Sequence, residues 1–429
     1  MTSERKVVWL TGFSHFFTHG AMTLLPAVLV VITGEQGISF TDIGLIATIG
    51  YFLYGFGAFP AGYLADRFGS KRVLTLGILG MAFSSLLVGF STGTVFFALA
   101  YALLGIFASI HHPAGLSLIA RRVEKKGKAL GFHGVLGNIG LTISPFIASA
   151  SVKYFDSWRA AYLLFGCFGL ILFGCMRSAR LEQEKDLSFR EMWHWRASTD
   201  RSASVTEKMS AVDTTSDSQP LSEPAIFPLV MLLLLLGCIL SGFIFRGSLT
   251  FFPMLFQQDV LFINQSDRPV VLAGYVTTAV LSLGLIGAWF GGYLNDKLKT
   301  PEIMPVIIFV IVAPVLYYIG RSTDTKLLAT SCLFSLVYYA WQPSQNYLIA
   351  KYTKKASHGM GFGVNFFLLF GVGSFATAAG GYMADSYGID RFYAVMAWIA
   401  LAALFTALAV LVVRPYYFKY SWKVVRESS

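Results

Sequence analysis

One charged stretch decides how this sequence is interpreted: Gly62-Tyr63-Leu64-Ala65-Asp66-Arg67-Phe68-Gly69-Ser70-Lys71-Arg72-Val73-Leu74. It lies between two long apolar runs, and a helix needs about 20 apolar residues to cross a bilayer. The stretch is therefore predicted to be a short turn between two membrane helices. Gly62 permits a close helix contact, Asp66 places a carboxylate at a helix end, and Gly69 breaks the chain before Arg72.

This order of Gly, Asp, a second Gly and trailing Lys or Arg after a second membrane helix resembles the loop motif of the major facilitator superfamily of secondary transporters. The resemblance implies an all-α membrane protein with twelve transmembrane helices in two parallel six-helix halves, the major facilitator fold. It also implies that Asp66, beside Arg67 and Arg72, acts as an inner gate latch facing the start of helix 11 near Ser357. The alternative is that these charges only mark the topology.

The composition supports a membrane protein. Hydrophobic residues make up 55% of the 429 residues and charged residues only 13%, with a mean hydropathy of +0.63; soluble proteins carry about a quarter charged residues. The net charge of +10 follows from Lys and Arg in cytoplasmic loops, so no nucleic-acid partner is predicted. The four cysteines show no disulfide or metal spacing, and no cofactor is predicted.

Twelve apolar segments can serve as membrane helices, beginning near residues 8, 42, 73, 94, 128, 158, 228, 270, 302, 325, 357 and 390. The predicted domains are a first half (1–177), a largely disordered cytoplasmic linker (178–226), a second half (227–415) and a cytoplasmic tail (416–429). The linker, rich in Ser, Thr, Asp and Glu, lacks the apolar residues that a folded core needs. Lys and Arg concentrate in the loops after helices 2, 4, 8 and 10, which places both termini in the cytoplasm.

An internal repeat with an offset of 230 residues relates the two halves. Gly62-Tyr63-Leu64 recurs as Gly292-Tyr293-Leu294, Asp66 as Asp296, and Pro113 as Pro343. Matches of Asp and Pro are far less frequent by chance than matches of Gly or Leu. Asp296 is therefore predicted to be a weaker copy of the Asp66 latch, facing the start of helix 5 near Lys128.

In the family that the loop resembles, helices 1, 4, 7 and 10 line a central cavity, and polar residues on them are candidate substrate ligands. Ionisable residues inside a membrane are expensive and often functional. The candidates here are His15 and His19 on helix 1, His111 and His112 on helix 4, Arg246 on helix 7, and Trp341, Gln342, Gln345 and Asn346 on helix 10. His133 on helix 5 is a further candidate. The alternative is that these side chains only bond neighbouring helices.

The candidate residues predict a polar, His-rich cavity with one Arg, suited to an anionic or strongly hydrogen-bonding solute. Histidine changes charge near neutral pH, and no Asp or Glu falls in the middle of a predicted helix. Proton coupling would therefore use a histidine or a peripheral acid, or would be absent. Gly134, Gly137, Gly140 and Pro145 on helix 5 loosely resemble the Gly/Pro-rich motif of antiporters.

Three passages resemble the fosmidomycin-resistance-like efflux permeases: Ser14-His15 before Leu25-Pro26, Phe40 to Ile46, and His112-Pro113. The leading prediction is therefore a secondary transporter that exports a small polar or anionic solute by alternating access. The alternative is an uptake or organelle-membrane permease for a metabolite or a metal species such as iron, as in magnetosome-associated members, since histidines are suitable iron ligands. A third option is a non-transporting sensor or scaffold.

An enzyme is not predicted, because the His boxes of membrane di-iron oxygenases need about eight clustered histidines and this chain has seven, of which His194 and His358 lie elsewhere. The predicted location is the inner (cytoplasmic) membrane or an organelle membrane derived from it. The predicted partners are the lipid bilayer, a small-molecule substrate and, as a candidate coupling ion, the proton. The protein is predicted to work as a monomer.

Overall fold

The computed structural model describes residues 2–179, 226–353 and 363–427. Within these residues the regular structure is helical throughout. The first half contains α1 (Ser3–Thr23), α2 (Leu25–Gln36), α3 (Phe40–Phe56), α4 (Ala58–Phe68), α5 (Ser70–Gly89), α6 (Thr94–Ala108), α7 (His111–Arg122), α8 (Lys126–Phe155) and α9 (Arg159–Ser178).

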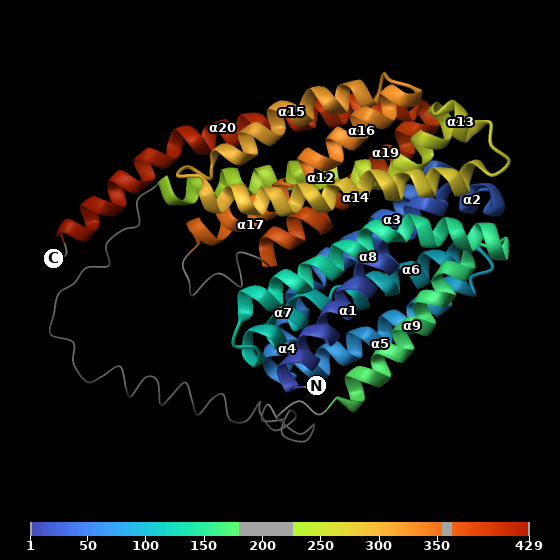
Figure 1. The fold of residues 1–429 in the computed structure, drawn as a ribbon, viewed down its shortest axis with the longest axis horizontal. Coiled ribbons are helices and arrows are strands. Elements are labelled where there is room, and N and C mark those ends of the chain that lie inside the picture. The colour runs from blue at the N-terminus through green and yellow to red at the C-terminus, as the bar shows by residue number, and fades with distance from the viewer. Residues whose placement is uncertain (1, 180–225, 354–362, 428–429) are drawn as a thin grey trace.

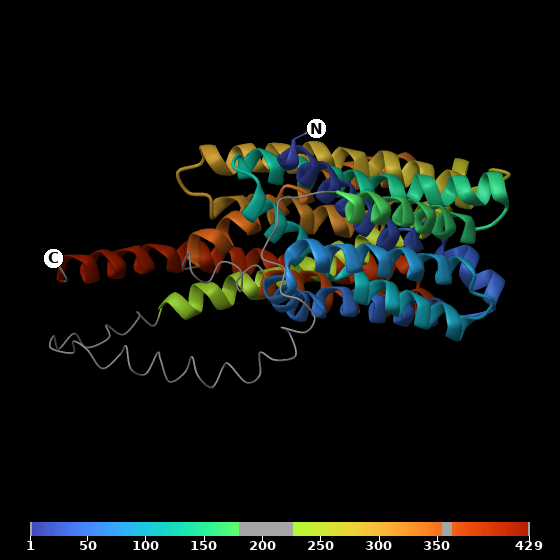
Figure 2. The same ribbon diagram turned by 90° about the horizontal axis from the view of Figure 1, so that it is seen from below.

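The second half contains α12 (Ile226–Asp259), α13 (Leu261–Asn264), α14 (Pro269–Lys297), α15 (Ile303–Ile319), α16 (Asp324–Tyr338), α17 (Trp341–Tyr352), the π turn η3 (Phe367–Gly371), the 3₁₀ turn η4 (Val372–Ser374), α19 (Phe375–Ser386) and α20 (Ile389–Glu427). Helix α20 continues past residue 416, where the sequence suggests a separate tail. It extends beyond the rest of the bundle (Figures 1 and 2).

Ten helical segments in the described residues are long and apolar enough to cross a membrane, and α15 is a shorter apolar helix. The pair α16 and α17 corresponds to the one predicted membrane segment still to be placed, which begins near residue 325. These twelve segments begin close to the predicted starts, so the all-α membrane fold is confirmed. The predicted domain limits stay predictions, since most of 178–226 lies outside the described residues.

The repeat is visible in where the helices break. Helices α6 and α7 are separated at Ser109 and Ile110, and α16 and α17 at Tyr339 and Ala340. The bounds of the two pairs differ by 230 residues at every end. In the first half this break starts a new helix at His111.

We call the end of the bundle with Asp66, Arg121 and Lys351 the basic end; the opposite end holds the start of α3 and the end of α19. Contacts between the halves are dense toward the opposite end, where α3 packs on α19 and α8 on α14. Toward the basic end, the described residues of α7 and α17 pack chiefly within their own halves. Figure 1 shows the two sets of ribbons diverging in that direction.

Asp385, at the end of α19, accepts hydrogen bonds from the first turn of α3 in the other half. The donors are the Phe40 N–H at 3.1 Å, the Thr41 N–H at 2.7 Å and the Thr41 hydroxyl at 2.6 Å. Farther along, Thr48 bonds with Thr377 at 2.6 Å. A carboxylate at a helix N-terminus satisfies unpaired N–H groups and complements the helix dipole. Asp385 therefore fastens the two halves together at the opposite end.

Candidate functional site

Five histidines meet inside the first half. His15 on α1 is the centre of the group: its ring centroid lies 4.2 Å from that of His133, 4.6 Å from His19, and 4.9 Å from both His111 and His112. His111 also stacks on His133 at 5.2 Å. All but His19 are buried, with at most 8% of their surface exposed. The structure thus brings together the histidines that the sequence singles out on helices 1, 4 and 5.

The local sequence explains this convergence. His15 and His19 are four residues apart on α1 and share a face, and His111 starts α7 at the helix break. Helix α8 approaches α1 closely because Gly137 lies against the His15 ring, where a Cβ would overlap it. Gly140 lies equally close to the Phe16 carbonyl. Gly137 and Gly140 therefore permit the close α1–α8 packing.

Three of the rings are held by hydrogen bonds. His15 Nδ1 donates to the backbone carbonyl of His133 at 2.8 Å. His111 Nδ1 pairs with the Ser14 hydroxyl and His112 Nε2 with the Tyr54 hydroxyl, both at 2.8 Å. Two other ring nitrogens, His15 Nε2 and His111 Nε2, are buried and have no hydrogen-bond partner among the described residues. These hydrogen bonds fix the orientation of three rings, and the unpartnered ring nitrogens remain available to bind a ligand.

Arg246 on α12 is the buried cation of the site, with 2% of its surface exposed. Its guanidinium carbon lies 3.9 Å from the ring centroid of Tyr51, 5.1 Å from Phe370 and 5.6 Å from Phe245. Its Nε has no hydrogen-bond partner within residues 2–179, 226–353 and 363–427. Among the described residues no carboxylate forms an ion pair with it. Aromatic faces attract a cation but do not neutralise it.

Phe370 joins Arg246 to the histidines. Its ring centroid lies 6.2 Å from His112, 6.3 Å from His19 and 5.5 Å from Tyr54. Phe370 belongs to the π turn η3, and such turns are frequent at functional sites. The histidines and Arg246 therefore face the boundary between the halves from both sides.

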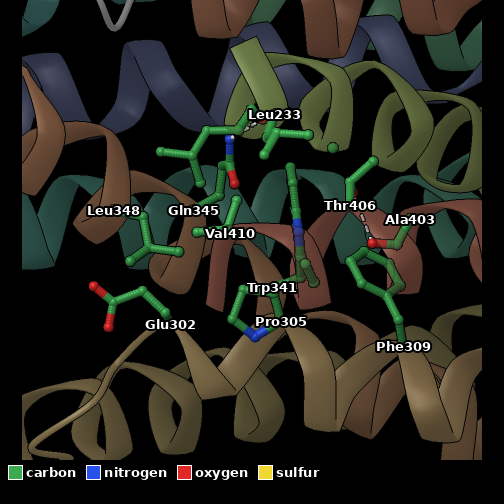
Figure 3. A pocket seen from close by; sticks show the side chains of 13 residues that line it. Leu233, Glu302, Pro305, Phe309, Trp341, Gln345, Leu348, Ala403, Thr406 and Val410 are labelled. Atoms are coloured by element: carbon green, nitrogen blue, oxygen red, sulfur yellow. Dashed lines mark hydrogen bonds between the residues drawn. The ribbon is translucent and has the colours of Figure 1, made fainter. Parts of the chain in front are cut away.

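Two of the helix 10 candidates, Trp341 and Gln345, lie in a separate part of the second half. Trp341 and Gln345 line a pocket within the second half, between α12, α15, α17 and α20 (Figure 3). Gln345 donates to the Leu234 carbonyl at 3.1 Å and to Asn365 at 3.3 Å. Gln342 and Asn346 are half-buried. Trp341 and Gln345 thus lie in a pocket of their own half, and the cavity role of Gln342 and Asn346 stays a prediction.

The same pocket shows a residue that the sequence analysis missed, the buried carboxylate of Glu302. It accepts from Lys351 and Tyr352, both at 2.6 Å, and from Arg414 at 3.1 Å. Burial raises the pKa of this carboxyl, but the Lys351 and Tyr352 hydrogen bonds outweigh burial and hold the pKa below its usual value. In the sequence, the only indication of this site is that Glu302 is a single acidic residue, directly after Pro301, near a basic helix end.

The gating candidates lie at the basic end. Asp66 is exposed and pairs with Arg121 on α7 at 2.5 Å, within its own half. Gly69 has φ +90°, which a residue with a side chain rarely adopts. Arg67 donates to Tyr63 at 2.8 Å. Gly62 would place a Cβ 3.6 Å from Pro113.

Arg72 and Asp296 are exposed. Ser357, the predicted neighbour of Asp66, lies outside the described residues, as do His194 and His358.

Comparison with known proteins identifies the relatives. The Escherichia coli membrane sensor protein UhpC is 23% identical over 82% of this chain and 77% of its own length. The multi-drug resistance efflux pump PmrA of Streptococcus pneumoniae is 24% identical over 94% of this chain and 95% of its own length. A crystal structure of peptide transporter POT in complex with sulfate has the same fold, with TM-score 0.72 and 16% identity over 96% of this chain and 95% of the other.

The profile of the Major Facilitator Superfamily matches residues 11–378, most of the chain. The charged loop, the repeat and the helical architecture agree with this match. The chain therefore belongs to the Major Facilitator Superfamily and is an integral membrane transporter.

Proposed function

We propose that this transporter exports a small organic anion by alternating access, with Arg246 as the group that binds the negative charge. The observation that carries the proposal is the burial of this guanidinium at the boundary between the halves, with no carboxylate partner among the described residues. An unpaired buried charge is costly, and intramembrane cations usually mark a substrate path. A bound anion supplies the missing partner.

The surroundings of Arg246 describe the rest of the solute. Tyr51, Phe245 and Phe370 present aromatic faces to the guanidinium, and ligand sites are lined mainly by apolar and aromatic side chains. The histidines supply polar ring nitrogens beyond Phe370. A compact anion with a flat or apolar part fits this combination better than a highly hydroxylated sugar.

The direction of transport is supported by two resemblances. PmrA, which aligns along almost the whole chain, is an efflux pump, and the Ser14-His15 and His112-Pro113 passages resemble the fosmidomycin-resistance-like permeases. We place the basic end in the cytoplasm by the positive-inside rule. The Asp385 contact with α3 then fastens the halves together at the outer end. The histidines make protons the candidate coupling ion.

The test is transport in proteoliposomes with a panel of radiolabelled organic anions and their neutral analogues, with and without an imposed proton gradient. The proposal predicts gradient-driven anion movement that is lost in Arg246→Ala. Arg321→Ala, which removes an exposed arginine at the opposite end, should leave it unchanged. Anion movement in the uptake direction alone would show that the protein imports its substrate and does not export it. Transport of neutral analogues only, unaffected by Arg246→Ala, would refute the anion site.

A further inference from the structure

We infer that the first half contains a binding site for one divalent transition-metal ion, formed by His15, His111 and His112. One ring nitrogen from each of these residues lies within 4.8 Å of the other two. The three side chains are buried and come from two helices, α1 and α7. Neutral imidazole is the commonest protein ligand for zinc, copper and nickel.

The separation of the three nitrogens suits a metal after a small adjustment. Three points no more than 4.8 Å apart share a centre within about 2.8 Å of each (4.8/√3). Zinc–nitrogen bonds are about 2.0–2.1 Å long. Closure therefore requires each nitrogen to move by roughly 0.7 Å, which a small rotation of each imidazole about its side-chain bonds provides.

The hydrogen bonds prepare the ligand atoms. A backbone carbonyl only accepts, so the bond to the His133 carbonyl places the proton of His15 on Nδ1. The neutral ring then carries its lone pair on Nε2, which is buried and has no hydrogen-bond partner in the described part of the chain. This is the arrangement in which a metal-binding histidine is oriented by a carbonyl on its other nitrogen. His111 pairs at Nδ1 with the Ser14 hydroxyl, which can accept or donate a hydrogen bond, so the same tautomer is open to His111 and leaves its Nε2 as the ligand atom.

Two further histidines surround the three ligands. His133 stacks on His15 and His111, with ring centroids 4.2 Å and 5.2 Å away. His19 lies 4.6 Å from His15, centroid to centroid. Protonating several of these histidines does not satisfy the unpartnered His15 and His111 nitrogens, because two charges about 5 Å apart repel by about 3 kcal/mol at an effective dielectric constant of 20. A single shared cation with several nitrogen ligands satisfies them together.

The donor set selects the class of metal. Three imidazoles without a carboxylate favour Zn²⁺, Co²⁺, Ni²⁺ or Cu²⁺ over Mg²⁺ and Ca²⁺, which prefer oxygen ligands. With three protein ligands, a fourth position stays open. His112 stacks on Phe366 of the second half at 4.9 Å, so the metal would bind beside the boundary between the halves. The site does not depend on Arg246 or on the proposed export of an anion.

The test uses Co²⁺, whose visible absorption reports its coordination, with detergent-purified full-length protein that lacks a polyhistidine tag. We expect one Co²⁺ per chain with the intense visible bands of a four-coordinate site, and displacement by Zn²⁺ but not by Mg²⁺. His111→Ala and His15→Asn should each weaken Co²⁺ binding at least tenfold. Cys238→Ala, which removes a buried side chain of a metal-binding type in the second half, is the control and should bind as the wild type does.

A folding defect is separated from ligand loss by His112→Cys, because a thiolate also binds Co²⁺. This variant should retain binding and add a sulfur-to-cobalt charge-transfer band. Arg246→Ala should bind Co²⁺ normally while losing anion transport, which separates this inference from the proposed function. Absence of stoichiometric Co²⁺ binding to the wild type, or binding unchanged in monodisperse His111→Ala and His15→Asn, would overturn the metal site.

Discussion

Replacing Asp385 is expected to open the end of the transporter that this side chain fastens. Asp385→Asn loses one of two acceptor oxygens and turns an amide NH₂ toward the backbone donors of α3, at Phe40 and Thr41. The loss of a helix N-cap costs about 1 kcal/mol, and we take this central value because Asp385 is exposed. Since 1.4 kcal/mol is a factor of ten, the ratio of open to closed molecules should rise about fivefold.

The assay is double electron–electron resonance between spin labels at Gly34→Cys in the first half and Gln265→Cys in the second, in a background without the native cysteines. Both positions lie at the opposite end and are exposed. The matched control is Asp324→Asn, which removes a carboxylate that caps the Leu261 N–H at 2.6 Å within the second half. Equal distance distributions for wild type and Asp385→Asn, or an equal shift in Asp324→Asn, would refute the clasp.

Three further predictions concern packing and charge. Gly137→Ala places a methyl group against the His15 ring and should lower stability by about 1–3 kcal/mol, seen as a lower Tm. Gly134→Ala, whose added methyl group meets no described residue within 4 Å, should leave the Tm unchanged. Equal Tm values for the two variants would contradict the α1–α8 contact. Glu302→Gln leaves two half-buried cations without their carboxylate and should cost about 2 kcal/mol at pH 7, below the range for a fully buried pair. The folded-state pKa of Glu302 is lowered, so its stabilisation is present above about pH 4.3, the unfolded value, and is lost as the pH falls through the folded value. The wild type should therefore lose its advantage in Tm over Glu302→Gln as the pH falls below about 4.5. An advantage that stays constant with pH would contradict this role. Asp66→Asn should abolish transport but keep normal membrane insertion, and normal transport kinetics would refute the gate latch.

Much of the fold could be predicted because it depends on local patterns. The charged loop ends α4, and Gly69 adopts a positive φ there. The offset of 230 residues gives equal helix breaks in the two halves. Hydrophobic length and turn residues fix these features without knowledge of tertiary contacts.

The candidate site was predicted only in part. His15 and His19 share a face by helical spacing, and the structure adds His111, His112 and His133 around them. Their convergence depends on the tight α1–α8 contact and could not be read from spacing alone.

Contacts between distant segments were harder to predict. The repeat aligns Trp341 with His111, but packing turns Trp341 and Gln345 into a pocket of their own half. In the sequence, Asp385 is only an acidic residue near a helix end. Its contact with Thr41, more than three hundred residues away in sequence, requires the tertiary arrangement of the halves.

The most direct test of the central claim is the affinity of Arg246 variants for a transported anion and for its neutral amide analogue. A hydrogen-bonded charge contributes about 2 kcal/mol, so the wild type should prefer the anion by roughly thirtyfold in Kd, and Arg246→Ala should bind both compounds alike. Arg321→Ala should retain the preference. A preference for the anion that persists in Arg246→Ala would show that another group binds the charge and would contradict the account.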